Sequence, residues 1–359
     1  MATTSMAWAE SCGITVGVDT HLDVHVARAK DHLGRPLGEK SIATTPAGYQ
    51  ELAAWAAELG PVQAFGIEGT GSYGAGLARH LRAGGHTVIE VGRPSRQARR
   101  ANGKSDPADA DAAASAVLSG DARAIPKAGD AEVEMIRCLR IARSTAIKAR
   151  IQATNAMKAL VVTAAPSLRE QLRALSTKNL VATCARLRPG PLEGPEAATK
   201  IALGSLAARA QGLEAEAREL RAHLDKLTTQ AAPRLRQRVG VGPDCAAALL
   251  LAAGDNPDRL RSESAFSMLC GASPVEASSG KVTRHRLNRG GDRQANAALY
   301  RIVLVRLRYD SRTQEYVQRR TKEGMSKIEI MRCLKRYVAR EVYQAITDAP
   351  PTPSTPETE

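Results

Sequence analysis

The N-terminal third of the chain alternates strand-like and helical patterns in an order that limits the folds open to it. Three strand-like stretches come first, and the short turns between them predict an antiparallel run. Helical and strand-like stretches then alternate. The expected strands are 14–19, 24–29, 36–42, 62–68 and 87–91, and the expected helices are 45–59, 75–83 and 106–118. One mixed sheet with helices on its faces is the simplest structure that accommodates this order.

That order matches an RNase H-like α/β domain, and it places acidic residues at positions typical of a site. In open α/β sheets, functional groups collect at the carboxyl ends of strands. Asp19 and Glu68 each end an expected strand, and Asp106 and Asp109 share one face at the start of an expected helix. Four such carboxylates could converge on one or two divalent cations, and hard oxygen ligands select Mg²⁺ or Mn²⁺.

Each acid also has a simpler interpretation. An acid after a strand is often only a turn residue, and Asp23 competes with Asp19 for a role in the same segment. Asp106 and Asp109 could serve only to interact with the positive end of a helix dipole.

A second feature lies near the C-terminus, where the sequence Ser278-Ser279-Gly280-Lys281 opens a run rich in arginine that ends at Arg293. Cationic side chains bind phosphates, and a serine hydroxyl can attack one. The alternative is a solvated basic loop whose serines act as caps.

The charge distribution indicates a nucleic-acid partner. The 359-residue chain has a formal net charge of +14, and residues 281–345 alone hold 17 Lys or Arg against 6 Asp or Glu. A surplus of this size favours nucleic acid or an anionic membrane. Aromatic residues make up only 3% of the chain, which favours phosphate contacts over base stacking.

A long helix is expected over 198–231, with small and leucine side chains repeating every seven residues. The repeat consists of Leu206, Leu213, Leu220 and Leu227 at one position and Ala210, Ala217, Leu224 and Ala231 at the other. This pattern predicts a coiled-coil seam, and together with a helix over 130–162 it could form an antiparallel arm. A single amphipathic helix in a bundle is the alternative.

The turn Gly240-Val241-Gly242-Pro243 has the form of a helix-hairpin-helix turn. Its two glycines could free backbone N–H groups for a DNA phosphate. The alternative is a glycine-rich turn that packs a pair of helices. The remaining C-terminal region is expected to be mainly helical, over 262–270, 293–308 and 326–346.

Other features bound the environment of the protein. The six cysteines are scattered without a C-x-x-C pair, which argues against structural zinc and a disulfide framework. No run approaches 18 apolar residues and the N-terminus lacks a signal pattern, so we expect a cytoplasmic, nucleoid-associated bacterial protein without a membrane partner.

Several blocks, taken together, resemble the "one-ten" family of insertion-sequence transposases, which are DEDD recombinases with a RuvC-like N-terminal domain. The blocks lie in order between 14 and 346 and surround the acids, the glycine turn and the serines. They are 17–21, 67–74, 104–110, 240–243, 271–274, 278–281 and 289–292. One departure is Glu276, an acid close before the serines.

The resemblance implies a mechanism. Asp19, Glu68, Asp106 and Asp109 would hold Mg²⁺ or Mn²⁺, and a serine would form a covalent bond to DNA. We favour Ser279, directly before the glycine, with Ser278 as the fallback. The family is also implied to use a bridge RNA that pairs with donor and target DNA. Its active site is implied to be composite, in a homo-oligomer (a dimer or tetramer) for which the helical arm would be the assembly device.

These patterns divide the chain into five expected segments. They are a leader over 1–12, a RuvC-like DEDD domain over 13–125, a helical coiled-coil arm over 130–232, a serine-bearing DNA-binding domain over 233–346 and a disordered tail over 347–359. The residues expected to contact nucleic acid are Lys104, Gly240, Gly242, Lys281, Arg284, Arg286, Arg289 and Arg293.

Four functions are compatible with these observations. The first is an RNA-guided transposase or recombinase. The main alternative is a metal-dependent Holliday-junction-type nuclease that uses the four acids and water. A sugar-kinase-like ATPase also begins with a glycine–aspartate strand, but it needs no basic cluster like that of 281–345. A non-catalytic nucleic-acid-binding protein would need no acids.

Overall fold

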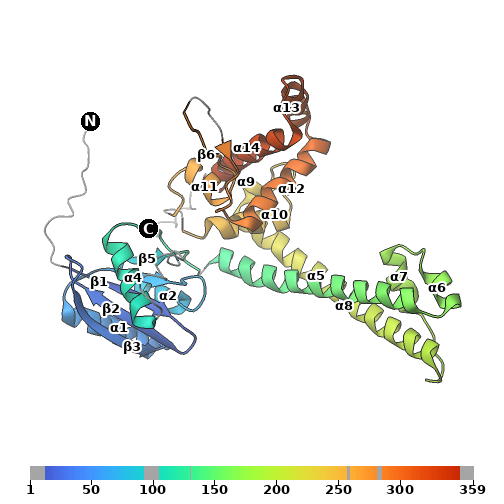
Figure 1. The fold of residues 1–359 in the computed structure, drawn as a ribbon, viewed down its shortest axis with the longest axis horizontal. Helices are drawn as coiled ribbons and strands as arrows, with labels where there is room; N and C mark the ends of the chain where they lie inside the picture. The colour runs from blue at the N-terminus through green and yellow to red at the C-terminus, as the bar shows by residue number, and fades with distance from the viewer. Residues whose placement is uncertain (1–12, 93–104, 130, 257–258, 281–284, 348–359) are drawn as a thin grey trace, which may run out of the picture. The chain divides into compact units, whose positions relative to one another are not determined.

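The structure is a computed structural model that describes residues 13–92, 105–129, 131–256, 259–280 and 285–347 (Figure 1). The expected leader, the tail after 347 and Lys104, Lys281 and Arg284 lie outside these ranges. The chain forms two compact units, one of residues 1–131 with 253–261 and the other of 132–252 with 262–359.

The first unit contains a five-stranded mixed sheet with the order β3-β2-β1-β4-β5. The strands are β1 (Ile14–Thr20), β2 (Val24–Lys30), β3 (Pro36–Ala43), β4 (Val62–Glu68) and β5 (Val88–Val91). The first three pair antiparallel, whereas β1–β4 and β4–β5 are parallel. The expected α/β sheet is therefore confirmed, and its topology is consistent with an RNase H-like domain.

Helices cover both faces of the sheet. The helices are α1 (Pro46–Leu59), which Thr45 caps by accepting from the Gly48 N–H, α2 (Ala75–Ala83) and α4 (Asp106–Leu118). Val16 and Ile67 belong to a buried core with Leu52 of α1 and Leu77 of α2. Gly17 and Gly66 alternate with those core residues along the strands, and both approach the backbone of α4 closely. The face opposite α1 and α2 is thus the face that α4 covers.

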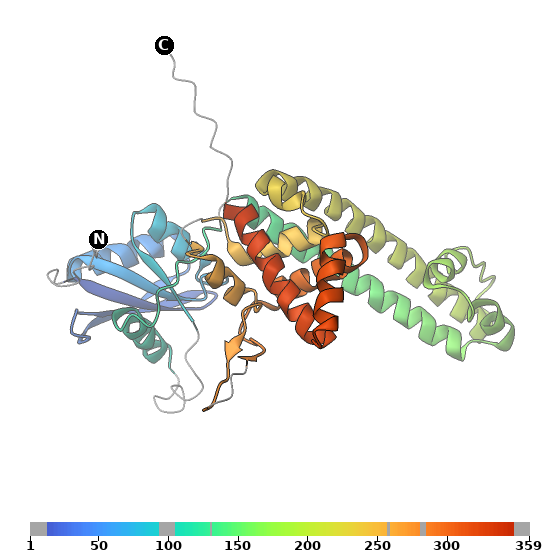
Figure 2. The same ribbon diagram turned by 90° about the horizontal axis from the view of Figure 1, so that it is seen from above.

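The second unit is helical apart from one short hairpin, within the residues that the structure describes. Two long helices, α5 (Glu132–Thr163) and α8 (Pro195–Ala231), lie side by side in an antiparallel pair (Figures 1 and 2). At one end of the pair, α6 (Pro166–Leu172) and α7 (Thr177–Cys184) complete a local core. These two short helices were not among the helices expected from the sequence.

The heptad positions of α8 are unequally buried. Ala210, Ala217 and Leu224 are buried, but Ala231 is exposed. The four leucines of the other heptad position are only half-buried. Three of the four side chains in one row of the seam are thus buried, and the coiled coil itself stays a prediction.

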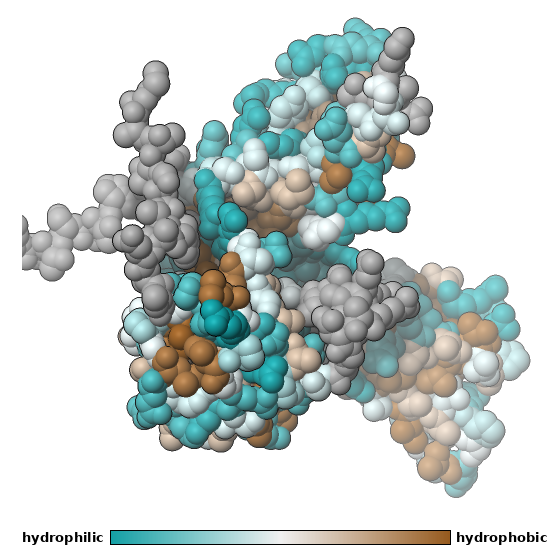
Figure 3. Space-filling model, turned by 60° about the vertical axis from the view of Figure 1, so that its left-hand side comes forward, coloured by the Kyte–Doolittle hydropathy of each residue, from teal (hydrophilic) through white to brown (hydrophobic). Residues whose placement is uncertain are grey.

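The rest of the second unit follows the pair of long helices. It consists of α9 (Pro233–Arg236), α10 (Pro243–Ala253), α11 (Glu263–Leu269), the hairpin β6 (Val275–Glu276) and β7 (His285–Arg286), α12 (Arg293–Tyr309), α13 (Ser311–Lys322) and α14 (Lys327–Thr347). The expectations had not included α13, which is strongly polar; in Figure 3 hydrophilic residues dominate the top of the view, where α13 lies. None of the described helices combines the length and apolarity that a bilayer crossing needs.

Candidate active site

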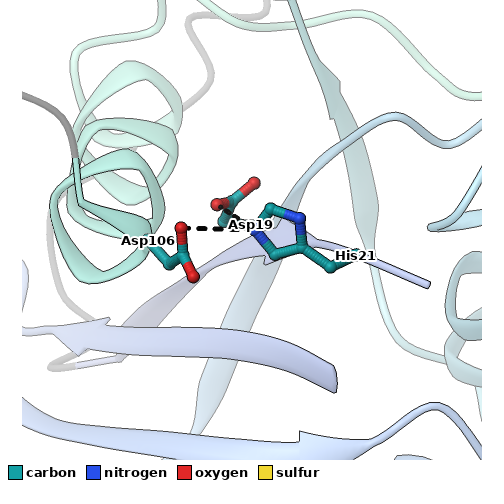
Figure 4. A group of neighbouring side chains, drawn as sticks. All are labelled: Asp19, His21 and Asp106. Carbon is teal, nitrogen blue, oxygen red and sulfur yellow. Dashed lines mark hydrogen bonds and ion pairs between the residues drawn. The ribbon is translucent and has the colours of Figure 1, made fainter. Parts of the chain in front are cut away.

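Three side chains converge at the carboxyl end of β1, the central strand of the sheet. Asp19 is the second-last residue of strand β1 and is 8% exposed, and His21 follows directly after that strand. Asp106 begins α4. The His21 Nε2 atom lies 3.2 Å from Asp19 Oδ2 and 3.3 Å from Asp106 Oδ1 (Figure 4). Among the described residues, these three offer ligand atoms that all lie within 4.8 Å of one another.

Asp19 is held in an electrostatically unfavourable place. Burial raises its pKa first, the nearby His21 lowers it, and the carboxylates of Asp109 and Asp106 raise it further. The effect of Asp109 places that residue within electrostatic reach of the same cluster. Acids crowded in this way disfavour one another's charge, which a bound cation would relieve. The donor set therefore fits a divalent cation.

Glu68 reaches the same region through the sheet. The register that pairs Val18 with Ile67 brings Asp19 and Glu68 to the same level of adjacent parallel strands. The Thr20 hydroxyl donates to the Glu68 carbonyl oxygen at 2.8 Å, which ties the two strand ends together. Glu68 is half-buried and is not among the three residues that converge most closely within the described part of the chain.

Two other acids of this unit, the rival Asp23 and Asp111, do not belong to the cluster found among the described residues. Asp23 is exposed in the turn after β1, and its backbone carbonyl accepts a hydrogen bond from the Thr44 N–H. Asp111 lies one residue beyond the buried Ala110 and accepts from Lys30 Nζ at 2.7 Å. Asp111 therefore pins α4 to β2, which is a structural role.

His21 was not among the residues expected to form the site, although one feature of the sequence could have indicated it. The signal was its position two residues after Asp19, because residues i and i+2 of an extended chain project to the same side. No sequence pattern could show that Asp106, at the start of α4, would approach the same imidazole, because that contact depends on how α4 packs on the sheet.

The contact between α4 and β1 depends on the absence of a side chain at Gly17. A Cβ added there would lie 2.0 Å from the Ala110 carbonyl oxygen and 2.3 Å from the Ala114 nitrogen. Both are backbone atoms of α4 and cannot move aside independently. This close approach brings the start of α4, with its two acids, to the end of β1.

We therefore expect Gly17→Ala to push α4 away from the sheet and lower stability by about 1–3 kcal/mol, the usual cost of overpacking. Thermal denaturation measures the effect. Gly71→Ala is the matched control, since a Cβ there meets nothing within 4 Å. Equal melting temperatures for the two variants would contradict this account of the α4 contact.

The serines lie on an exposed hairpin. Val275 pairs with Arg286 and Glu276 with His285. Beyond this short ladder Ser278 and Ser279 are both exposed, and Gly280 takes the left-handed conformation with φ 56°. A glycine is the residue best suited to that conformation.

Close packing and hydrogen bonds hold the base of the hairpin in place. A Cβ on Gly291 would lie 2.2 Å from the Gly271 nitrogen, so the chain segments that enter and leave the hairpin cross in close contact at these two glycines. The Asn296 amide donates to the carbonyl oxygens of Cys270 and Gly271 at 2.9 and 3.0 Å. Lys335, itself 8% exposed, donates to the Asn296 Oδ1 at 3.1 Å. The serine-bearing tip thus extends from a fixed base.

Three of the expected nucleic-acid contacts surround that base. Arg286, Arg289 and Arg293 are all exposed. Arg289 and Arg293 line one cavity of about 430 Å³, and Arg286 lines another of about 230 Å³ with three cationic residues of α14. The three arginines therefore present their charge at the surface beside the hairpin.

The two glycines of the expected helix-hairpin-helix turn differ. Gly240 has φ 84°, and a Cβ there would lie 3.0 Å from the Ile302 carbonyl oxygen, so it packs against α12. Gly242 faces open space. Arg306 of α12 donates to the Val239 carbonyl oxygen at 2.9 Å, and this hydrogen bond ties the residue before the turn to α12.

Two family models match the chain. A DEDD transposase model of the IS110 type matches residues 16–166, which include all four acids, and a model of the transposase IS116/IS110/IS902 family matches residues 232–318, which include the serine hairpin. No curated protein matches the chain. The two models agree with each other and together span well over half of the sequence, so the chain belongs to the IS110 family of transposases and is an enzyme that acts on DNA.

Proposed function

We propose that this transposase cuts and rejoins DNA through a covalent serine–DNA intermediate, with its acids holding Mg²⁺ or Mn²⁺. The observation that carries the proposal is the convergence of Asp19 and Asp106, with Asp109 in electrostatic reach, inside the region that matches the DEDD transposase model. Glu68, at the neighbouring strand end, completes the set of four carboxylates that we assign to the metal.

The cation, when bound, would neutralise the scissile phosphate and stabilise charge as the phosphodiester reacts. The acids hold that cation, and the serine hairpin delivers the nucleophile. The Ser279 Oγ gives up its proton and bonds to phosphorus, while one P–O bond to a sugar oxygen breaks. The sugar oxygen that leaves takes up one proton and becomes a hydroxyl. Rejoining reverses these events with a hydroxyl from another strand and regenerates the serine.

The cationic surface supports binding to donor and target DNA. Arg286, Arg289 and Arg293 are exposed around the hairpin, and we assign them to phosphate contacts. We extend this assignment to Lys104, Lys281 and Arg284, which lie outside the described residues, and to Gly242. The packing of Gly240 on α12 leaves it a supporting role in the same turn.

We further propose that a bridge RNA selects the DNA sequences. Base pairing with a guide would leave the protein to bind backbone and shape. A basic chain with only 3% aromatic residues suits this division of labour.

Assembly of a dimer or tetramer through the helical arm is part of the proposal. The four leucines at 206, 213, 220 and 227 repeat along α8 and are only half-buried in the single chain. Their remaining surface would be buried against a second copy. Such an assembly would allow the acids over 13–125 of one protomer to act with the serine over 233–346 of another, with the arm over 130–232 between them.

A metal-dependent nuclease is the second candidate. A cluster of acids can direct water at a phosphodiester without any serine, and the exposed hairpin would then only bind phosphate. The two functions differ in whether DNA becomes bonded to protein.

Covalent trapping tests the proposal. Purified protein is incubated with its flanking RNA, labelled donor and target DNA and Mg²⁺, and the products are separated on a denaturing gel. We expect a protein–DNA adduct that mass spectrometry maps to Ser279 and that is absent without divalent metal. Cut DNA with no adduct would establish the nuclease instead.

A further inference from the structure

We propose that His21 is a direct ligand of the catalytic cation and makes the site favour Mn²⁺ over Mg²⁺. The inference rests on the proposed metal function of Asp19 and Asp106 and assigns a residue outside the four acids. It concerns which atoms hold the ion and therefore which ion is held.

The geometry of one nitrogen carries the inference. His21 Nε2 is the ring atom that lies 3.2 Å from Asp19 Oδ2 and 3.3 Å from Asp106 Oδ1. The two carboxylates come from different elements, β1 and α4, and the imidazole points between them (Figure 4). An ion bound by both acids would therefore meet a nitrogen donor at the same place.

The local backbone holds the imidazole on that side. Thr20, between Asp19 and His21, turns its hydroxyl away to the Glu68 carbonyl oxygen at 2.8 Å. The alternation of an extended chain then directs Asp19 and His21 to the opposite side together. His21 is also accessible, because its side chain is 51% exposed while that of Asp19 is 11% exposed. Asp19 would bind the ion from within and His21 from the solvent side.

The donor type decides the preference among metals. Carboxylate oxygens alone suit Mg²⁺, whereas imidazole nitrogen suits transition metals. A site of carboxylates with one imidazole keeps enough oxygen ligands for Mn²⁺ and adds a nitrogen that Mg²⁺ binds poorly. An ion pair between His21 and the acids would instead leave the metal preference to the carboxylates.

Pulsed electron paramagnetic resonance of the Mn²⁺-loaded full-length protein tests the inference without measuring catalysis. A directly bonded imidazole couples its ¹⁴N nucleus to the manganese electrons, and we expect this modulation in the native protein. His21→Ala and the polar variant His21→Asn should both lose it. His32→Ala, which removes an exposed histidine from the turn after β2, should keep it.

Titration with Mn²⁺ and competition with Mg²⁺ give the second readout. We expect His21→Ala to weaken Mn²⁺ binding by about 100-fold, since even residues that only orient a ligand change metal affinity by 10- to 100-fold. Mg²⁺ binding should change much less, so the preference for Mn²⁺ should fall. The exposure of His21 makes misfolding of these variants unexpected, and circular dichroism checks it.

The outcomes separate the two levels of the proposal. Mn²⁺ that binds tightly without ¹⁴N coupling, with equal affinity in His21→Ala, would overturn the role of His21 and leave the acid site standing. An absence of Mn²⁺ binding by the native protein, unchanged by Asp19→Asn, would overturn the metal site on which the proposed function rests.

Discussion

Ser279→Ala should abolish the covalent protein–DNA adduct and reduce strand cleavage by about a millionfold, the scale on which a serine nucleophile matters in a well-studied hydrolase. The substitution removes the only atom that would bond to phosphorus. It leaves the hairpin intact, because Ser279 is exposed and the base of the hairpin is held by Asn296 and the Gly271–Gly291 crossing. DNA binding, measured by gel shift, should therefore be unchanged.

Ser278→Ala is the matched control for this prediction. It removes the same hydroxyl group one residue earlier on the same exposed loop. We assign the reaction to Ser279 because it directly precedes Gly280, whose φ of 56° turns the chain at the tip. An adduct that survives in Ser279→Ala and disappears in Ser278→Ala would transfer the role to Ser278. Cleavage retained by both variants would support the water-using nuclease.

Much of the sheet could be predicted from the sequence because its physical causes are local. The strands around Val16 and Ile67 are runs of β-forming residues, and the core residues alternate with others along them. Gly17 and Gly66 interrupt those runs, and the reason for glycine at these two positions cannot be read from the sequence. Only the fold shows that both glycines admit the backbone of α4.

The candidate site was predictable in part for the same reason. Asp19 and Glu68 end strands, and the parallel pairing of β1 with β4 brings them to one level. His21 was missed because its contact with Asp106 spans 85 residues of sequence and depends on how α4 crosses the sheet. The helical spacing directs Asp111 away from the face that Asp106 and Asp109 share, but its contact with Lys30 could not be read from the sequence.

In the helical unit, the sequence predicted the long helices better than it predicted which of their side chains are buried. The heptad repeat of α8 predicted a long helix, and α8 extends over Pro195–Ala231. The repeat could not show that Ala217 and Leu224 would be fully buried while the leucine row stays half-buried. That difference depends on which side of α8 faces α5, which no single heptad specifies.

Asp19→Asn should reduce adduct formation by about a thousandfold while leaving the folded protein at least as stable. The nearly isosteric amide removes one carboxylate from the metal-binding set, and a loss of about 4 kcal/mol of transition-state stabilisation lowers a rate by about that factor. The stability change has the opposite sign. Folding raises the pKa of Asp19, chiefly through burial and also through Asp109 and Asp106. A carboxyl with a raised pKa destabilises the folded state at pH values above that pKa, and an amide does not.

Two measurements on the same samples test the expected loss of adduct formation and the expected gain or retention of stability. Covalent trapping reports the reaction, and thermal denaturation near neutral pH without metal reports the stability. Asp23→Asn, in the exposed turn four residues later, is the matched control and should leave both unchanged. A melting temperature that falls clearly in Asp19→Asn would indicate that the carboxylate stabilises the fold through its contact with His21. Asp19 would then be retained for structure, and the case for a metal site at the end of β1 would lose its electrostatic basis.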